Sequence, residues 1–114
     1  MAQIIDGKSI SKEIREEIAR TCGWDFPVAV RFSPKSMIKD WRKGALPGED
    51  FEEKGRDLEE GLKTAKLLEA YGYDALDVDV GCYDAWWWNH PPMYMEKGPY
   101  RKYAKLVKET VKVA

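Results

Sequence analysis

The chain has 114 residues, which indicates one domain and excludes a complete eight-stranded α/β barrel, since such a barrel needs about 250 residues. Hydrophobic residues make up 44% of the chain and charged residues 34%, and 19 basic side chains nearly balance 20 acidic ones. This balance argues against nucleic acid or a membrane surface as the main partner.

Processing and targeting signals are not evident in the sequence. There is no apolar signal segment at the start and no run of about 18 apolar residues. Cys22 and Cys82 lie far apart, without the spacing of a zinc or redox motif, so free thiols in a reducing compartment are expected. These features predict a soluble cytoplasmic protein.

The first predicted element is an amphipathic helix over residues 9–20. Its apolar residues recur every four positions among charged ones: Ile10, Ile14 and Ile18. Asp6 or Ser9 can cap its start, and Gly23 can end it by adopting a left-handed conformation.

Two segments then show strand periodicity, at residues 26–32 and 75–81. Aromatic and aliphatic residues alternate with other types in the first, while Asp77 and Asp79 alternate with aliphatic residues in the second. A helix is predicted between them, with an apolar stripe that ends at Gly72: Leu58, Leu62, Ala65, Leu68 and Tyr71. A strand, a helix and a strand in this order predict a parallel βαβ unit.

The connection between the first strand and this helix is rich in glycine and proline. A short helix over residues 36–43 could bury Met37 and Trp41 there. Asp50 and Glu53 have the spacing of a capping box for the following helix. Gly61 weakens that helix by roughly 1 kcal/mol relative to Ala unless another backbone packs closely against it.

The last third of the chain begins with an aromatic loop at residues 82–94. Pro99 then opens a final helix, which places four residues on its inner face: Tyr100, Tyr103, Val107 and Val111. The alternation of strands and helices places a further strand at residues 111–114.

Together these elements predict an α/β protein in the order helix, strand, helix, strand, helix. The single domain 1–114 comprises an N-terminal helix segment, 1–21, and a βαβα segment, 22–114. Residues 3–5 are a candidate third strand. Because two parallel strands leave open edges and are seldom stable alone, a homo-oligomer that completes the sheet is expected.

Residues 22–113 resemble a central segment of the Old Yellow Enzyme family, in particular the NADH:flavin oxidoreductases related to 2-enoate reductase and the bile-acid-inducible oxidoreductases. The resemblance lies in an ordered series of segments: 25–33, 69–81 and 83–94. It implies a partial (β/α) barrel and FMN as the cofactor, which would pass hydride from NAD(P)H to an activated alkene.

The same resemblance implies roles for individual residues. Arg31 would lie beside the flavin, and the aromatic loop would form the substrate side of the site through Tyr83, Trp86, Trp87, Trp88 and His90. The family's tyrosine proton donor and phosphate site have no counterpart in this sequence, so no catalytic residue is assigned. The isolated chain is therefore expected to bind no FMN and to lack independent catalysis.

The first 20 residues resemble a different family, the bifunctional methylenetetrahydrofolate dehydrogenase/cyclohydrolases. The resemblance rests on residues 1–8 followed by Ile10, Ile14 and Arg15. It implies a fusion or chimera of two α/β proteins with a junction near residues 20–23. A family variant or a natural fragment would give the same sequence.

Simpler alternatives stand beside each functional interpretation. Arg31 can pair with Asp77 or Asp79 instead of a flavin. Those two carboxylates without a third ligand give little support to a metal site. His90 and Cys82 are the candidate acid–base and nucleophilic groups, or ordinary loop residues.

Two functions therefore remain open for the chain. One is a segment of a flavin oxidoreductase whose tryptophans stack on a flat substrate. The other is a catalytically silent structural or interaction module whose tryptophans cover core or form a self-association surface.

Overall fold

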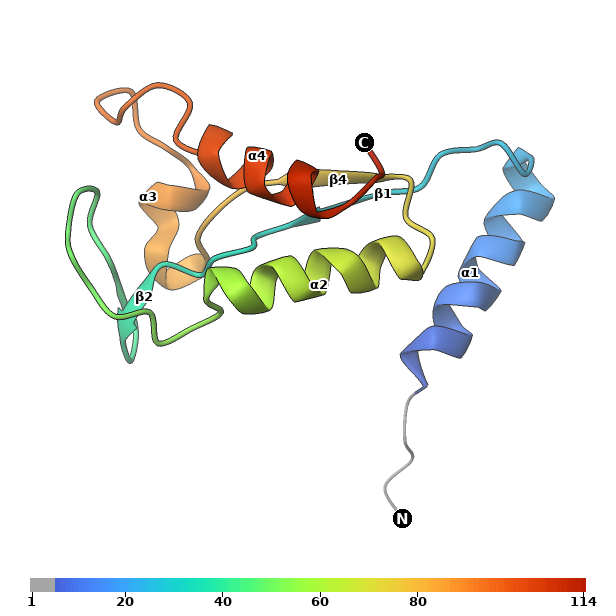
Figure 1. The fold of residues 1–114 in the computed structure, drawn as a ribbon, viewed down its shortest axis with the longest axis horizontal. Helices are drawn as coiled ribbons and strands as arrows, with labels where there is room; N and C mark the ends of the chain where they lie inside the picture. The colour runs from blue at the N-terminus through green and yellow to red at the C-terminus, as the bar shows by residue number, and fades with distance from the viewer. Residues whose placement is uncertain (1–5) are drawn as a thin grey trace, which may run out of the picture.

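A computed structural model describes residues 6–114 (Figure 1). The candidate strand at residues 3–5 lies outside this part of the chain. The described elements are, in chain order, α1 (Gly7–Cys22), β1 (Ala29–Phe32), β2 (Ile38–Asp40), β3 (Lys43–Gly44), α2 (Leu58–Ala70), β4 (Ala75–Val78), the 3₁₀ helix η1 (Tyr83–Ala85), α3 (Trp86–Asn89) and α4 (Arg101–Thr110). This order confirms the predicted α/β class, with two small sheets and no closed barrel within the described residues.

Helix α1 extends two residues beyond the predicted range of 9–20 at each end, and Asp6 and Gly23 flank it as predicted. The Asp6 carboxylate accepts a hydrogen bond from the Lys8 amide at 3.1 Å, and Gly23 follows the helix with a φ of 102°. The helix touches the rest of the domain through few groups, among them an ion pair of 3.8 Å between Arg15 and Asp74. Ile10 and Ile14 remain 43% and 52% exposed, so most of the predicted apolar stripe has no partner among residues 6–114.

Strands β1 and β4 form the predicted parallel pair. Val30 lies opposite Leu76, Arg31 opposite Asp77, and Phe32 opposite Val78. Since side chains alternate along a strand, the apolar members of these pairs share one face and the charged members share the other.

Helices α2 and α4 cover the apolar face of this sheet (Figure 1). Ala65 of α2 and Val107 of α4 are buried there together with Val111, and Phe32, Leu76 and Val78 pack against them. The inner face predicted for the last helix is confirmed at Tyr103, Val107 and Val111. The helical layer therefore leaves the charged face of the sheet without a cover among the described elements.

The end of the chain lies along the second edge of β4. The Ala114 amide donates to the Asp74 carbonyl at 3.2 Å, and the Leu76 amide donates to the Ala114 carbonyl at 2.8 Å. A residue that bonds to both neighbours of Ala75 in this way has the pairing of a parallel strand. The expected extension at residues 111–114 is thus present as extended chain, although it is too short to count as a strand.

The short helix predicted at residues 36–43 is wrong, because these residues form the antiparallel hairpin of β2 and β3. Met37 is buried as expected, but Trp41 is 81% exposed at the turn. Met37 and Arg42 have φ values of 62° and 55°, which no α-helix accommodates. Gly44 permits the hairpin to lie directly against the backbone of Asp84 and Ala85.

The predicted capping box is also wrong, since α2 begins at Leu58. Its N-cap is Asp57, whose carboxylate accepts from the Glu60 amide at 2.8 Å. Glu53 instead accepts from the amides of Met37 and Ile38, both at 2.8 Å, and so ties the hairpin to the following loop. Gly61 packs against the backbone of Pro34, which is the close approach that its place in a helix requires.

Candidate functional site

The charged face of the sheet carries a three-residue cluster at the ends of β1 and β4. Arg31 Nε lies 3.0 Å from Asp79 Oδ2 and 3.6 Å from Asp77 Oδ2. Asp79 is buried, with 7% of its surface exposed, and it also accepts a hydrogen bond from the Ser33 hydroxyl. Strand pairing therefore fixes Arg31 between two carboxylates, as one of the two interpretations of the sequence predicted.

The guanidinium of Arg31 can still donate hydrogen bonds to a group outside this cluster. The Arg31 side chain is 60% exposed, and the ion pairs use its Nε. Its two terminal nitrogens have no hydrogen-bond partner within residues 6–114, so their donors can meet an electron-rich acceptor. Because Asp77 and Asp79 together outweigh the charge of Arg31, the cluster has a net negative charge. This charge disfavours binding of an anionic ligand beside the guanidinium.

The predicted aromatic loop contains two short helical turns, η1 and α3, and these divide its rings into two sets. The first set lies on the outside. The ring centroids of Tyr83 and Trp86 are 5.6 Å apart, and those of Trp86 and His90 are 4.1 Å apart. Tyr83 is 87% exposed, so this ladder offers ring surface to solvent.

The second set points inward and supports the hairpin. Trp87 Nε1 and Trp88 Nε1 donate to the same acceptor, the Ala45 carbonyl, at 2.8 and 2.7 Å. Trp88 belongs to a buried cluster whose other members are Met37, Val80, Ala85 and Tyr103. Trp88 is therefore core, as the structural alternative predicted.

Tyr100 connects the aromatic segment to the charged cluster. Its hydroxyl donates to the carbonyls of Trp88 and Asn89, the latter at 3.0 Å. Burial raises the pKa of this hydroxyl, the charge of Asp79 raises it further, and Arg31 opposes the shift. The neutral hydroxyl of Tyr100 thus interacts electrostatically with both Asp79 and Arg31. The sequence pattern predicted Tyr100 only as a residue on the inner face of the last helix.

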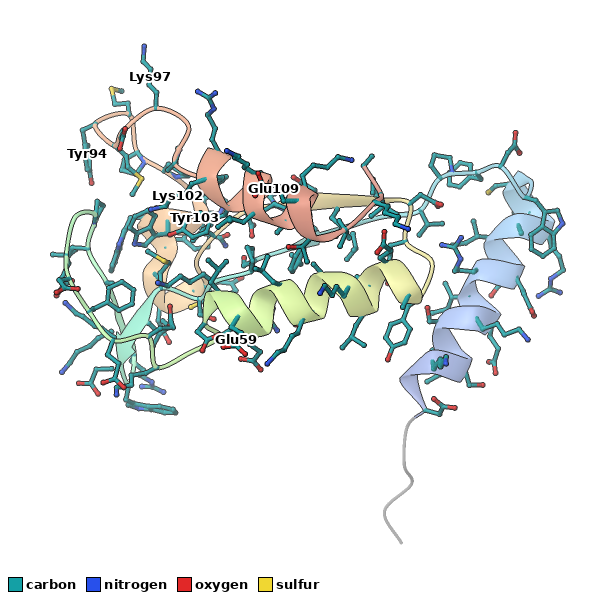
Figure 2. The ribbon with its side chains drawn as sticks, viewed as in Figure 1. Glu59, Tyr94, Lys97, Lys102, Tyr103 and Glu109 are labelled. Atoms are coloured by element: carbon teal, nitrogen blue, oxygen red, sulfur yellow. The ribbon has the colours of Figure 1, made fainter. Side chains whose placement is uncertain are left out.

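A groove of about 940 Å³ opens beside α3. Leu46, Pro47 and Gly48 form one wall, and the loop before α4 forms the other. Both Trp87 and Trp88 line the groove, and half-buried Trp87 contributes most of the aromatic surface, since Trp88 is only 8% exposed. The second wall and the start of α4 supply the remaining lining residues: Pro92, Tyr94, Met95, Glu96, Lys97, Gly98, Pro99, Arg101 and Lys102. Figure 2 shows Tyr94 and Lys97 on the loop and Lys102 at the start of the helix.

Of the predicted substrate-side residues, only Trp87 and Trp88 line this groove, while Tyr83, Trp86 and His90 form the outer ladder. The cations Arg101 and Lys102, at the start of α4, also line the groove and were not predicted from the sequence. His90 is exposed and has no carboxylate among its described contacts. Cys22 and Cys82 are free thiols.

Residues 6–114 contain no cluster of three side chains suited to hold a metal ion. None of their helices combines the length and the apolar character needed to cross a membrane.

Two curated proteins match most of the length of this chain. A stretch of 101 residues is 58% identical to the cinnamate reductase of Clostridium sporogenes and covers 89% of this chain. A stretch of 102 residues is 32% identical to the NADH oxidase of Thermoanaerobacter brockii, again with 89% of this chain covered. The chain is therefore homologous to a segment of each protein. It spans 15% and 13% of their respective lengths. No protein-family profile matches the chain, and no solved structure does.

The length of these matches bears on the proposed fusion. Any stretch of 101 residues in a chain of 114 includes residues 14–101, so the junction expected near residues 20–23 lies inside the stretch shared with the cinnamate reductase. The second half of α1 thus belongs to the same homologous segment as the sheet. The comparisons give no support to a fusion with a folate enzyme.

Proposed function

We propose that this chain forms part of an FMN-dependent reductase of unsaturated carboxylic acids from the Old Yellow Enzyme family, and that it supplies one wall of the active site without catalysing the reaction alone. The observation that carries the proposal is the 58% identity with a cinnamate reductase over 89% of the chain. Arg31, Trp87 and Trp88 all lie within the stretch that any such alignment must include.

The charged face of the sheet fits one edge of a flavin. Arg31 offers free donors on a face that none of the described helices covers, and Asp79 orients its guanidinium from a buried position. When bound, FMN would supply hydride transfer from NAD(P)H to an activated alkene. Arg31 would donate hydrogen bonds to an electron-rich carbonyl of the ring, and the nearby aromatic segment would orient a flat substrate.

The phosphate of FMN has no matching cradle among residues 6–114. No glycine-rich loop precedes a helix with the spacing that phosphate binding requires. The proposal therefore assigns the phosphate site and the proton donor to protein outside these 114 residues. Under this proposal the chain alone binds flavin weakly and turns over no substrate.

Flavin fluorescence quenching by the purified chain tests the proposal. We expect weak saturable quenching of FMN and a roughly tenfold loss of affinity in Arg31→Ala, the effect of removing one charged hydrogen-bond donor. Arg20→Ala on the exposed surface of α1 is the matched control and should bind as the parent does. Folded protein that binds no FMN, or equal weakening by both substitutions, would contradict the role of Arg31.

A second candidate function is an interaction module, and exposed apolar side chains favour it. Trp24 and Trp41 are each 81% exposed, and Met93 is fully exposed. The edge of β1 that faces away from β4 has no partner strand in the described part of the chain. We propose that copies of the chain associate through the exposed apolar side chains and the open edge of β1. Light scattering at micromolar concentration should show a dimer or larger species, and a monomer would exclude this candidate.

A further inference from the structure

The outer face of α4 and of the two residues that follow it is almost uniformly basic. Tyr103, Val107 and Val111 bury the inner face of this segment in the core, so the exposed positions face away from the sheet (Figure 1). Every exposed position from 101 to 112 is charged: Arg101, Lys102, Lys105, Lys108, Glu109 and Lys112. These six residues, here called the basic face, carry five positive charges and one negative charge, although the whole chain has a net charge of −1.

The other two long helices have balanced surfaces. The exposed positions of α1 include three cations and three carboxylates, and those of α2 include two of each. Opposite charges one turn apart also pair on both helices, Lys12 with Glu16 at 3.8 Å and Lys63 with Glu59 at 2.7 Å. Among the three long helices, the excess of positive charge therefore lies on α4.

The spacing of charges on α4 destabilises the helix itself. Side chains three or four positions apart are neighbours on a helix, and like charges at that spacing repel. Arg101 lies four positions before Lys105, and Lys105 lies three positions before Lys108. Natural sequences depart from such local preferences most often at functional sites, so the pattern indicates a binding surface.

Most of this charge is not compensated within residues 6–114. Of the five cations only Lys105 forms a salt bridge there, with Glu109 at 3.8 Å. Lys108 Nζ donates to the Val113 carbonyl, and Lys102 Nζ lies 4.9 Å from the centroid of the Tyr103 ring. Both of these partners are neutral, so they leave the positive charge of the face in place.

We propose that the basic face binds an acidic segment of a partner protein. Carboxylates accept charge-assisted hydrogen bonds from lysine and arginine, and complementary charge steers and orients such encounters. The face extends about 10 Å along the helix axis from Arg101 to Lys108, which matches a short run of carboxylates. The proposal is independent of the proposed function, because it requires neither flavin nor the groove.

The distribution of charge over the chain favours a partner with a small anionic area. Since the basic face carries +4 and the whole chain −1, the other residues carry −5. An extended polyanion, such as nucleic acid or an anionic bilayer, would also meet this negative surface and be repelled by it. None of the exposed side chains of the face is apolar, so none could enter a bilayer. A short acidic segment contacts the basic face alone.

Fluorescence anisotropy with a labelled acidic peptide and the 114-residue chain tests the proposal. The probe is an alanine-based helical peptide with four glutamates at intervals of three or four residues, and the control peptide has glutamines in their places. We expect saturable binding of the glutamate peptide and none of the glutamine peptide. Affinity should fall about tenfold between low and physiological ionic strength, because salt screens exposed charges.

The double variant Arg101→Gln/Lys105→Gln locates the peptide. It should weaken binding of the glutamate peptide by about tenfold. Lys63→Gln/Lys66→Gln on α2 is the matched control, because it changes the net charge by the same amount on a balanced face. The control should bind within about twofold of the parent. Circular dichroism should show the same helix content in all three proteins.

Several results would overturn the proposal: equal weakening by the two double variants, equal affinity for the two peptides, or no binding of the glutamate peptide by the folded parent. Phosphatidylglycerol vesicles and a single-stranded oligonucleotide test the other partners. If either binds more tightly than the peptide and loses affinity in Arg101→Gln/Lys105→Gln, the assignment to an acidic protein is wrong. The flavin titration bears on the proposed function alone, since its outcome does not depend on α4.

Discussion

The two faces of the β1–β4 sheet differ in what stabilises them. On one face Phe32, Leu76 and Val78 pack under α2 and α4 around buried Val107. On the other, Arg31 is held between Asp77 and buried Asp79 and remains largely exposed. Apolar burial is worth more than exposed ion pairing, so the first face contributes stability and the second offers hydrogen-bond donors.

The difference shows how one short alternating sequence serves two purposes. A two-residue period places every second side chain of β1 in the core and leaves the others for chemistry. Substitutions on the two faces should therefore have separable effects, which the following predictions test in order of expected size.

Gly61→Ala should have the largest effect on stability. A Cβ at this position would overlap the backbone carbonyl of Pro34, so α2 would have to move away from the segment that follows β1. We expect a loss of about 3 kcal/mol, measured as a lower urea midpoint. Gly7→Ala is the control, because a Cβ there meets no atom within 4 Å. A Gly61→Ala protein as stable as the parent would show that α2 and Pro34 are not in close contact.

Val107→Ala tests the covered face directly. Val107 is 2% exposed and packs in the cluster with Ala65 and Val111. Removing two methyl groups should lower the free energy of unfolding by about 2 kcal/mol. Lys108→Ala, at the neighbouring exposed position, should change it by less than about 0.5 kcal/mol. Equal effects of the two substitutions would contradict the assignment of the core.

Arg31→Ala tests the open face. Asp79 would keep its hydrogen bond from Ser33 but lose its cation, and we expect a loss of about 1 kcal/mol because the guanidinium is largely exposed. Asp77→Asn should cost less than about 0.5 kcal/mol, since this carboxylate is exposed and lies 3.6 Å from Arg31 Nε. A loss of stability in Asp77→Asn that exceeds the loss in Arg31→Ala would contradict the conclusion that Asp79 is the main partner of Arg31. Chemical denaturation of both variants gives the comparison.

Tyr100→Phe should show the smallest effect in the pH dependence of stability, which is separate from the loss at neutral pH of the hydrogen bonds to the Trp88 and Asn89 carbonyls. Burial and the charge of Asp79 raise the pKa of the Tyr100 hydroxyl above its ordinary value of 10.0. The folded state then favours the neutral form, so this contribution is present below pH 10 and is lost as pH rises through the folded pKa. The variant should lose stability less steeply than the parent above pH 10. Tyr94→Phe, at an exposed ring, should follow the parent curve.

Much of the fold was predictable from local patterns. Alternation identified both strands, and the four-residue apolar spacing identified α1, α2 and the inner face of α4. Asp6 caps α1 as predicted. These features depend on neighbours in sequence, which is why periodicity detects them.

The hairpin was not predictable in the same way. It depends on two hydrogen bonds that the Glu53 carboxylate accepts from backbone amides of the hairpin, and on the contact of Gly44 with Asp84. All of these interactions join residues that are far apart in the chain. The apolar residues Met37 and Trp41 have helical spacing, but tertiary contacts override it. Local propensity carries no information on such pairings.

The candidate site was predictable only in part. The pairing of Arg31 with the aspartates followed from strand register, and Trp87 and Trp88 were on the predicted segment. The sequence did not reveal that one carbonyl binds both indoles, or that the start of α4 closes the groove. Arg101 and Lys102 were not among the predicted site residues, because a basic pair in a mixed-charge chain has no distinctive pattern.

The shared acceptor at Ala45 has an optical consequence. Both indoles that contribute to the groove depend on one carbonyl, so displacement of residues 45–48 would break both hydrogen bonds together. Opening of this segment should thus change the emission of two tryptophans at once, in proportion to the population that has opened. Time-resolved emission of the unlabelled protein could follow that movement without any introduced probe.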